Sequence, residues 1–335
     1  RDARWGRGLE GVGEDPYLAR QFAAARVRGF QGSSLSNADS MLATPKHFAA
    51  YGAAEGGLDY NSSDISERTL REVYLPPFRA AIDAGALSVM SAFNEIGGIP
   101  STANHALLTG VLRDEWKFKG FVVSDFTADE ELIEHGYAAN SREAAKMAFM
   151  AGTDMSMQSG LYMRHLPDLV ASGEVPMARL DEAVRRVLHV KQKLGLFDDP
   201  FRGLDGPPAA KRTENPEFIA LAREDARRSI VMLKNEAKLL PLPKAGTKIA
   251  LIGPFSEGTK DLMGSWSLFP GQSAPVGIDE GLRAAVGPDS SLTIARGSNV
   301  ESPLPGGIEA AVAAARDADV VVLAIGESQK MSGES

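Results

Sequence analysis

Residues 120–126, with the sequence GFVVSDF, constrain the fold more than any other part of the chain. A short run of Phe and Val bounded by Gly and polar residues is typical of a strand buried on both faces. Helical patterns flank it: Asn104 can cap a helix before it, and residues 129–131 (DEE) give the next segment an acidic helix start. This order predicts a parallel α/β unit, in which chemistry sits at the carboxyl ends of strands. Asp125 occupies that end, either as a catalytic group or as a helix N-cap.

The composition of the 335-residue chain argues against several kinds of partner. A net charge of −8, with no basic run longer than two residues, argues against nucleic acid. No apolar run approaches the roughly 18 residues that a membrane span needs, so we expect no membrane partner. Without cysteine, neither a disulfide nor a thiolate metal site can form, and both cytoplasm and an export compartment remain open. The chain opens at Arg1 in the middle of a motif, so a missing leader says nothing about export.

The first 200 residues alternate strand and helix patterns, which is typical of a (β/α) barrel. Asp15 and Pro16 have the residue types of an N-cap and a first helical position. The predicted strands cover residues 41–45, 87–90, 120–124 and 153–157. The predicted helices cover residues 16–28, 66–85 with an interruption at Pro76 and Pro77, 104–116, 141–151, 161–172 and 176–195. A complete (β/α)8 barrel has eight strands in about 250 residues, so we expect its first strands to precede Arg1 and residues 1–203 to be its later portion.

A second domain is predicted after a linker. Residues 204–215 are rich in Gly, Pro and charge, which is typical of a linker. Within residues 216–335 the pattern predicts a helix at 216–233, buried strands at 248–253 and 318–326, and an Ala-rich helix at 308–315. This is the pattern of an open-sheet α/β domain of which the chain contains the first part.

Several chemistries are excluded by missing motifs. The sequence contains no G-x-S-x-G elbow, no H-E-x-x-H zinc site and no Walker A loop. Residues 253–258 (GPFSEG) follow a strand, but they lack the middle Gly of a dinucleotide-binding loop. The five His are scattered, with none paired at metal-ligand spacing. We therefore expect no cofactor and no metal.

The polar residues at strand ends are the remaining candidates for chemistry. Lys46 and His47 follow the strand predicted at 41–45, and parallel strands would bring them to the same mouth as Asp125. These residues and Arg7 could hold sugar hydroxyls or an anionic group, although a lone His or a loop Arg is more often structural. A carboxylate nucleophile in retaining glycoside hydrolysis needs a second carboxyl group about 5–5.5 Å away. Spacing alone leaves four candidates for it: Glu130, Glu131, Glu327 and Glu334.

A series of motifs resembles family 3 glycoside hydrolases, and most closely their bacterial β-glucosidase branch. The matching segments, in order, are residues 1–7 (RDARWGR), 13–16 (GEDP), 46–48 (KHF), 51–57 (YGAAEGG), 91–94 (SAFN), 121–125 (FVVSD), 234–236 (KNE), 239–242 (LLPL), 264–267 (GSWS) and the Gly-rich end. The similarity runs essentially the whole length of the chain. The loop at 49–59 has no His, unlike the β-N-acetylhexosaminidase branch, which uses a His-Asp pair there.

This resemblance implies a (β/α)8 barrel followed by an αβα sandwich, with the site between them. It implies Asp125 as nucleophile and Glu334 as acid/base, in a Ser-Gly-Glu loop. The residues that would bind or line the sugar subsite are Arg7, Lys46, His47, Met90, Phe93 and Phe126. Family members often carry Tyr in place of Phe93 and Trp in place of Phe126, so these departures bear on sugar preference. A family Asp that grips the non-reducing sugar would precede Arg1.

The function expected from the resemblance is that of an exo-acting retaining β-glucosidase, acting on β-glucosides or cello- and gluco-oligosaccharides. One alternative is a β-xylosidase or α-arabinosidase on the same scaffold, and another is a non-catalytic sugar-binding relative. The resemblance implies a periplasmic or secreted protein. The oligomeric state stays open.

Overall fold

The computed structural model describes residues 2–204, 215–264, 267 and 275–331. The chain divides into two compact units, whose described parts are residues 2–204 and 215–331. Both units are of the α/β class, because each has a parallel sheet and helices. Within the described residues, no helix is long and apolar enough to cross a membrane.

The first unit is built on a three-stranded parallel sheet in the order β1 (Ser88–Met90), β4 (Phe121–Phe126), β5 (Met155–Met157). Val123 pairs with both Met90 and Met155, so the strands end at one edge of the sheet. The start of β4 lies close to β1, because a Cβ on Gly120 would come within 2.0 Å of the Leu87 carbonyl oxygen. The predicted strands at 87–90, 120–124 and 153–157 are therefore confirmed.

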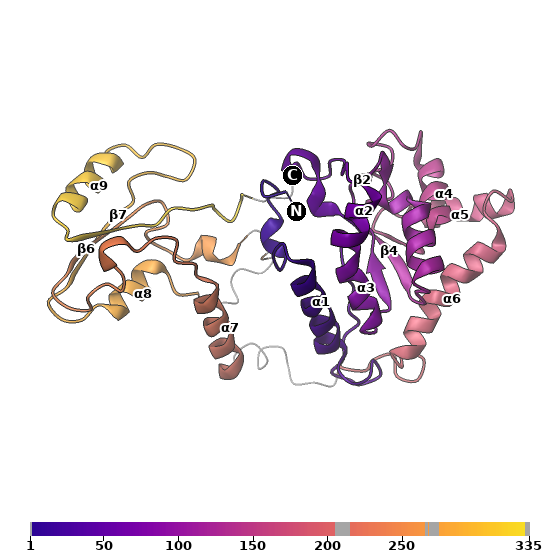
Figure 1. Ribbon diagram of the computed structural model, residues 1–335, viewed down its shortest axis with the longest axis horizontal. Helices are drawn as coiled ribbons and strands as arrows, with labels where there is room; N and C mark the ends of the chain where they lie inside the picture. Colours follow the sequence, from indigo (N-terminus) through magenta and orange to yellow (C-terminus); the bar gives the residue numbers. More distant parts are fainter. Residues whose placement is uncertain (1, 205–214, 265–266, 268–274, 332–335) are drawn as a thin grey trace. The chain divides into compact units, whose positions relative to one another are not determined.

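Helices cover both sides of this sheet, with α1 and α3 on one side and α4, α5 and α6 on the other (Figure 1). Their bounds are α1 (Pro16–Gln31), α2 (Glu67–Thr69), α3 (Leu75–Asp83), α4 (Ser141–Ala151), α5 (Leu161–Ala171) and α6 (Met177–Lys193). Two π-helical segments are η4 (Leu70–Tyr74) and η6 (Ala106–Glu115), and a short hairpin joins β2 (Glu95–Ile96) to β3 (Ile99–Pro100). The 3₁₀ turns are η1 (Gly8–Glu10), η2 (Tyr51–Ala53), η3 (Glu55–Gly57) and η5 (Ser101–Ala103).

Two predicted helix caps are confirmed. The Asp15 carboxylate accepts a hydrogen bond from the Tyr17 N–H at 2.8 Å, with Pro16 as the first residue of α1. The Asn104 side chain accepts from the Leu107 N–H at 3.0 Å and so satisfies a free donor at the start of the next helix. These caps are local in sequence, which is why residue types alone reveal them.

Three predictions for this unit are wrong. Residues 41–45 run beside β1 but form no strand. The backbone contacts of this segment with β1 and the residue after it are one isolated bridge, between Phe48 and Ser91, and two backbone hydrogen bonds of Met90, which are too few for a ladder. Residues 129–131 begin no helix and lie in successive turns. The two prolines do not interrupt the helical run, because α2, the π-helical η4 and α3 follow one another without a gap; Pro76 and Pro77 lie at the start of α3, directly after the π-helical turns. The described residues also form no closed sheet, so a closed barrel is not seen.

The second unit has a parallel sheet in the order β7 (Ser291–Ala295), β6 (Lys248–Ile252), β8 (Val320–Leu323). Its helices are α7 (Pro216–Ser229), α8 (Ile278–Ala285) and α9 (Gly307–Arg316), with 3₁₀ turns η8 (Glu236–Lys238) and η9 (Lys260–Met263). Figure 1 shows α8 and α9 on opposite faces of this sheet. The buried strand predicted at 248–253 and the helix at 308–315 are confirmed, whereas α8 and β7 were not predicted. The strand predicted at 318–326 is shorter, at 320–323, and it is not buried, because its residues alternate between half-buried and exposed. The helix predicted at 216–233 ends at Ser229.

The core of the first unit comprises two main clusters of buried side chains. One contains Phe48, Val89, Leu108 and Val122, and the other contains the fully buried Leu132, Leu161 and Leu169. Both β4 valines are buried, as the sequence pattern predicts for a central strand. The packing holds β4 firmly and leaves its carboxyl end to carry polar groups.

Candidate active site

Asp125 lies at the carboxyl end of β4 and is buried. Its Oδ1 atom accepts a hydrogen bond from the Phe126 N–H at 2.7 Å, and its carbonyl oxygen accepts from the Ala128 N–H at 3.1 Å. Burial raises the pKa of the Asp125 carboxyl, while the Phe126 N–H and the charges of Lys46 and Arg7 act to lower that pKa. The carboxylate is therefore less stable as an anion than an exposed Asp, although donors and cations surround it.

Cationic side chains gather around this carboxylate. The Nε2 atom of His47 lies 3.1 Å from Asp125 Oδ2, an ion-pair contact when the imidazole is protonated. Arg7 is buried, and its Nη2 atom lies 3.5 Å from the same His47 nitrogen. Lys46 is exposed and contributes its charge from the neighbouring position. The structure thus brings together four of the predicted residues, although no strand ends at residue 45.

Two aromatic side chains, Trp5 and Tyr51, hold Arg7 and His47 in place. Tyr51 is buried, and its ring contacts His47 edge-on at 5.1 Å between centroids and lies 5.5 Å below the Arg7 guanidinium carbon. Trp5 packs against Tyr51 at 5.2 Å and donates its indole N–H to Asp59 at 2.6 Å. The guanidinium also donates to the Glu10 carboxylate at 2.7 and 3.0 Å. Short segments far apart in sequence therefore hold Arg7 and His47 in place.

The other predicted subsite residues lie nearby in different environments. Met90 ends β1 and is half-buried beside β4. Phe93 is buried, and its ring packs against Tyr60 at 4.7 Å between centroids. Phe126 follows Asp125 directly and is 55% exposed, so its ring is available for contact. Glu334, the predicted acid/base, lies outside the described residues.

The structure also reveals polar residues beside Asp125 that sequence reasoning did not assign to the site. Thr127 has φ 58°, and its hydroxyl contacts Glu131 Oε1 at 3.1 Å. His135 Nδ1 lies 2.9 Å from Glu95 Oε1, and Ser62 donates to the other oxygen of Glu95 at 2.8 Å. The spacing of Glu131 and His135, four residues apart just after the strand end, was the available signal. The acidic run at 129–131 predicts a helix start instead, and Glu131 is otherwise one of four candidates for the acid.

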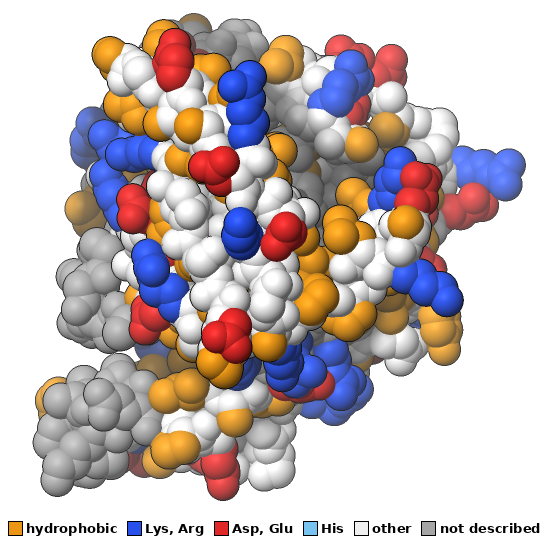
Figure 2. Space-filling model, turned by 90° about the vertical axis from the view of Figure 1, so that its left-hand side faces the viewer, with side chains coloured by type: hydrophobic (Ala, Val, Ile, Leu, Met, Phe, Trp, Pro, Cys, Tyr) orange, Lys and Arg blue, Asp and Glu red, His pale blue; other side chains and the backbone are white. Residues whose placement is uncertain are grey.

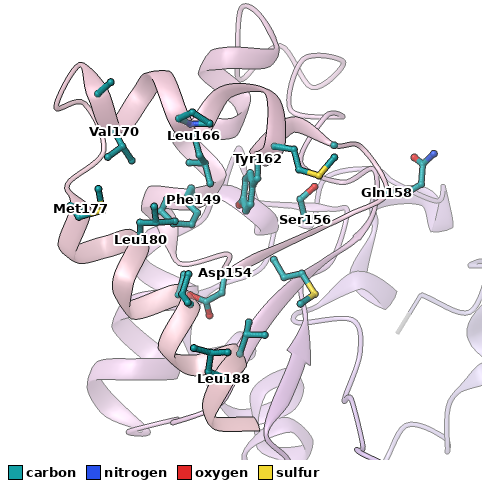
Figure 3. A pocket seen from close by; sticks show the side chains of 18 residues that line it. Phe149, Asp154, Ser156, Gln158, Tyr162, Leu166, Val170, Met177, Leu180 and Leu188 are labelled. Atoms are coloured by element: carbon teal, nitrogen blue, oxygen red, sulfur yellow. The ribbon is translucent and has the colours of Figure 1, made fainter. Parts of the chain in front are cut away.

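The hollows of the first unit differ in their relation to Asp125. A groove of about 990 Å³ is lined mainly by apolar side chains of α5 and α6, among them Tyr162, Leu166, Met177, Leu180 and Leu188 (Figure 3). Neither Asp125 nor Arg7, Lys46 or His47 lines it, so this groove is not the candidate active site. A smaller hollow of about 420 Å³ is lined by Lys46, His47 and Tyr51, although Asp125 does not line it either. Among the described residues on the face drawn in Figure 2, acidic and basic side chains are interspersed and form no single-sign patch.

Comparison with known families identifies two matching domain models. The glycosyl hydrolase family 3 N terminal domain matches residues 1–190, and the glycosyl hydrolase family 3 C-terminal domain matches residues 230–335. Asp125 and the cationic side chains around it all fall within the first match.

Similar proteins and structures agree with these matches. A periplasmic beta-glucosidase from Salmonella typhimurium is 43% identical across 100% of this chain and 47% of its own length. A beta-xylosidase from Formosa agariphila is 38% identical across 99% of this chain and 48% of its own length. The crystal structure of a beta-glucosidase from Listeria innocua in complex with isofagomine has a TM-score of 0.91 at 41% identity, covering 100% of this chain and 46% of that one. A mutant of the Listeria enzyme was crystallised with laminaribiose and gives the same TM-score. The chain spans about half the length of these relatives.

Proposed function

Because the chain belongs to glycosyl hydrolase family 3, we propose that the protein is an exo-acting retaining β-glucosidase. It removes terminal non-reducing β-D-glucosyl residues from β-glucosides and gluco-oligosaccharides. The observation that carries the proposal is the buried Asp125 carboxylate at a strand end, with His47 Nε2 at 3.1 Å and the charges of Lys46 and Arg7 acting on it. Similarity to the Salmonella and Listeria proteins supports glucose as the sugar.

The proposal includes the domain arrangement. Residues 1–203 would be the later portion of a (β/α)8 catalytic barrel, residues 204–215 a linker, and residues 216–335 the first portion of an αβα sandwich. Three parallel strands with helices on both sides support the first assignment, and the parallel sheet of the second unit supports the last. A periplasmic or secreted location is proposed from similarity to the periplasmic Salmonella enzyme.

The proposed reaction has two steps and needs no cofactor. Asp125 Oδ2 attacks the anomeric carbon, the bond to the leaving oxygen breaks, and that oxygen takes a proton from Glu334. In the second step Glu334 accepts a proton from water, whose oxygen displaces Asp125 and restores the β configuration. The cations near Asp125 favour its ionised form, which is the form that attacks.

The sugar would be held by the groups that gather around Asp125. Arg7, Lys46 and His47 carry N–H donors suited to sugar hydroxyls. Met90 and Phe93 would line the subsite, and the exposed Phe126 ring would offer an apolar face to the sugar. Phe93 and Phe126 have neither a hydroxyl nor an indole N–H. They therefore offer the substrate fewer hydrogen bonds than Tyr and Trp at these positions would.

Covalent trapping tests the nucleophile directly. The complete protein is incubated with 2-deoxy-2-fluoro-β-glucosyl fluoride, and the label is located by peptide mass spectrometry. We expect one glucosyl adduct on Asp125, and we expect Asp125→Ala to lose several orders of magnitude in kcat while the exposed control Asp114→Ala keeps its rate. An adduct on another carboxylate, or near wild-type turnover by Asp125→Ala, would refute the assignment.

A second candidate function is the same chemistry on a pentoside. Similarity to the Formosa beta-xylosidase favours this alternative. It predicts a higher kcat/KM for an aryl β-xyloside or α-arabinoside than for the aryl β-glucoside, whereas our proposal predicts the reverse order. A non-catalytic relative would bind these sugars without releasing the aryl group.

A further inference from the structure

The turn after Asp125 contains a strained residue. Thr127 adopts φ 58°, a left-handed backbone conformation that a β-branched side chain strongly disfavours. Such residues persist only where surrounding contacts determine their conformation, and they cluster at functional sites. Thr127 lies two residues after Asp125, and the Ala128 N–H closes the turn by donating to the Asp125 carbonyl at 3.1 Å.

The strained residue is linked to the Asp125 carboxylate through Phe126. The Thr127 hydroxyl lies 2.6 Å from the Phe126 carbonyl oxygen, and the Phe126 N–H donates to Asp125 Oδ1 at 2.7 Å. The orientation of the carboxylate therefore depends on the Phe126 backbone, which in turn depends on where the Thr127 hydroxyl is held. A rotation of the Thr127 side chain would release its contact with the Phe126 carbonyl oxygen.

Glu131 holds Thr127 in place. Its Oε1 atom lies 3.1 Å from the Thr127 hydroxyl oxygen, and its backbone N–H donates to the Thr127 carbonyl at 3.0 Å. The Thr127 hydroxyl donates to Glu131 Oε1 and also faces the Phe126 carbonyl oxygen, so its single hydrogen is shared between two acceptors. Burial raises the pKa of the Glu131 carboxyl, and Asp125 and Asp129 act in the same direction, whereas the hydrogen bond from Thr127 and the nearby His135 act to lower that pKa. Glu131 thus holds Thr127 through two contacts, one to the side-chain hydroxyl and one to the backbone carbonyl.

The same segment is anchored to two other loops. His135, four residues after Glu131, pairs through Nδ1 with Glu95 of β2 at 2.9 Å. Ser62 donates to the second oxygen of Glu95 at 2.8 Å, and the Ser63 N–H donates to the Glu95 carbonyl at 2.7 Å. Glu131 therefore sits on a segment that is fixed at both ends, which suits a group that must hold its neighbour still.

We propose that Glu131 is a positioning residue, which clasps the Thr127 hydroxyl and thereby fixes the Asp125 carboxylate for attack. Glu131 does not touch the sugar and is not the acid/base. The inference rests on the proposed function, because it needs Asp125 to be the nucleophile. A displacement of reacting atoms by about 1 Å costs about 100-fold in rate, so loss of the clasp should appear in kcat more than in KM.

The experiment compares Glu131→Ala and Glu131→Gln in the complete protein. Stoichiometry and rate of Asp125 labelling by the fluorosugar are measured with kcat, KM and the melting temperature. We expect Glu131→Ala to label fully but about 100-fold more slowly, with KM changed less than about threefold. Glu131→Gln keeps a side-chain oxygen that can accept from the Thr127 hydroxyl and should label within about threefold of the wild type. Glu134→Ala, an exposed position on the same segment, is the control and should match the wild type.

A second pair of variants tests the clasp from its other side. Thr127→Gly removes the hydroxyl and adopts the left-handed backbone without strain, so it should fold even if Glu131→Ala does not. We expect Thr127→Gly to slow labelling, and the double variant Thr127→Gly/Glu131→Ala to be no slower than the worse single variant.

Several results would overturn the proposal. One is labelling of Glu131→Ala at the wild-type rate. Another is a smaller labelled fraction that reacts at the normal rate, which is what a purely structural role produces. A third is fully additive losses in the double variant. Failure of the proposed function is separate, because it would appear as a wild-type adduct away from Asp125.

Discussion

Asp154 is the buried charge whose loss should most weaken the first unit. Its side chain is completely buried between η6, β4 and α6. The groups that donate to it are the Val122 N–H at 2.9 Å, Arg113 at 2.6 Å, Arg179 at 3.1 Å and Arg186 at 2.8 Å. The Asp154 N–H in turn donates to the Val122 carbonyl at 2.9 Å, so one residue holds both backbone groups of a central strand position. Figure 3 shows Asp154 at the edge of the apolar groove, near Leu188 of α6.

Replacing Asp154 with Ala leaves three arginines without this carboxylate and one backbone donor without an acceptor. Removing one partner of a buried ion pair costs about 3–5 kcal/mol, and an orphaned buried donor costs about 1–3 kcal/mol. The arginine side chains are 9, 13 and 21% exposed, so water relieves part of this cost. Burial lowers the pKa of Arg113 to about 10, and Asp154 opposes that shift. We therefore expect a loss of about 4 kcal/mol, a large part of the 5–15 kcal/mol typical of folded proteins.

Equilibrium urea unfolding of the complete protein, followed by tryptophan fluorescence, measures this loss. With a urea dependence of about 2–3 kcal/mol/M, the midpoint of the Asp154→Ala variant should fall by about 1.3–2 M. The control is Asp181→Ala, which breaks an exposed ion pair to Arg185 at 3.2 Å and should cost less than about 1 kcal/mol. A loss for Asp154→Ala no larger than that of the control would refute the reasoning, because it would mean that water or other groups satisfy the arginines.

Three further predictions concern the nucleophile and one helix. Lys46 lowers the pKa of Asp125, so Lys46→Met should move the acidic limb of the kcat/KM profile to higher pH; an unmoved limb would contradict this. The folded-state pKa of Asp125 is raised, so its ionisation costs stability as pH rises through that pKa; Asp125→Asn should therefore melt higher than the wild type at neutral pH, and this gain should vanish in acid. Asn140 accepts from the Glu143 N–H at 3.0 Å and caps α4, so Asn140→Ala should cost about 1 kcal/mol in urea unfolding, whereas no loss would mean that water replaces the cap.

The parts of the fold that the sequence predicts are those set by local patterns. The strand at 120–124 is predicted because a short apolar run between Gly and a carboxylate is typical of a buried strand. The structure has β4 at this place. The edge strand β7 was missed because its residues alternate between exposed and half-buried over five positions and carry a weak signal. Tertiary contacts decide residues 41–45, where the chain runs beside β1 but exchanges too few backbone bonds for a strand.

The candidate site divides in the same way. His47 and Asp125 are close because both lie at the carboxyl edge of the sheet. This proximity was predicted correctly, although the strand predicted before Lys46 does not form. The clasp between Thr127 and Glu131 could not be predicted, because a positive φ at a Thr contradicts its local preference and is imposed by neighbouring contacts. Residues whose conformation contradicts their own propensity are not predicted from the sequence, and they are found most often at functional or strained sites.

The balance of charge around Asp125 suits the proposed mechanism. Cations that bind sugar hydroxyls also stabilise the carboxylate, and a carboxylate that is stabilised too strongly is a weaker nucleophile. Arg7 donates two bonds to Glu10, at 2.7 and 3.0 Å, so part of its charge is neutralised before it acts on Asp125. Lys46 is exposed, so solvent screens its charge. Burial therefore outweighs both cations and leaves the pKa of Asp125 raised. The site can therefore place several hydrogen-bond donors near the sugar and still keep the Asp125 carboxylate reactive. Because burial makes this carboxylate less stable as an anion, forming a covalent bond to the sugar is more favourable for it.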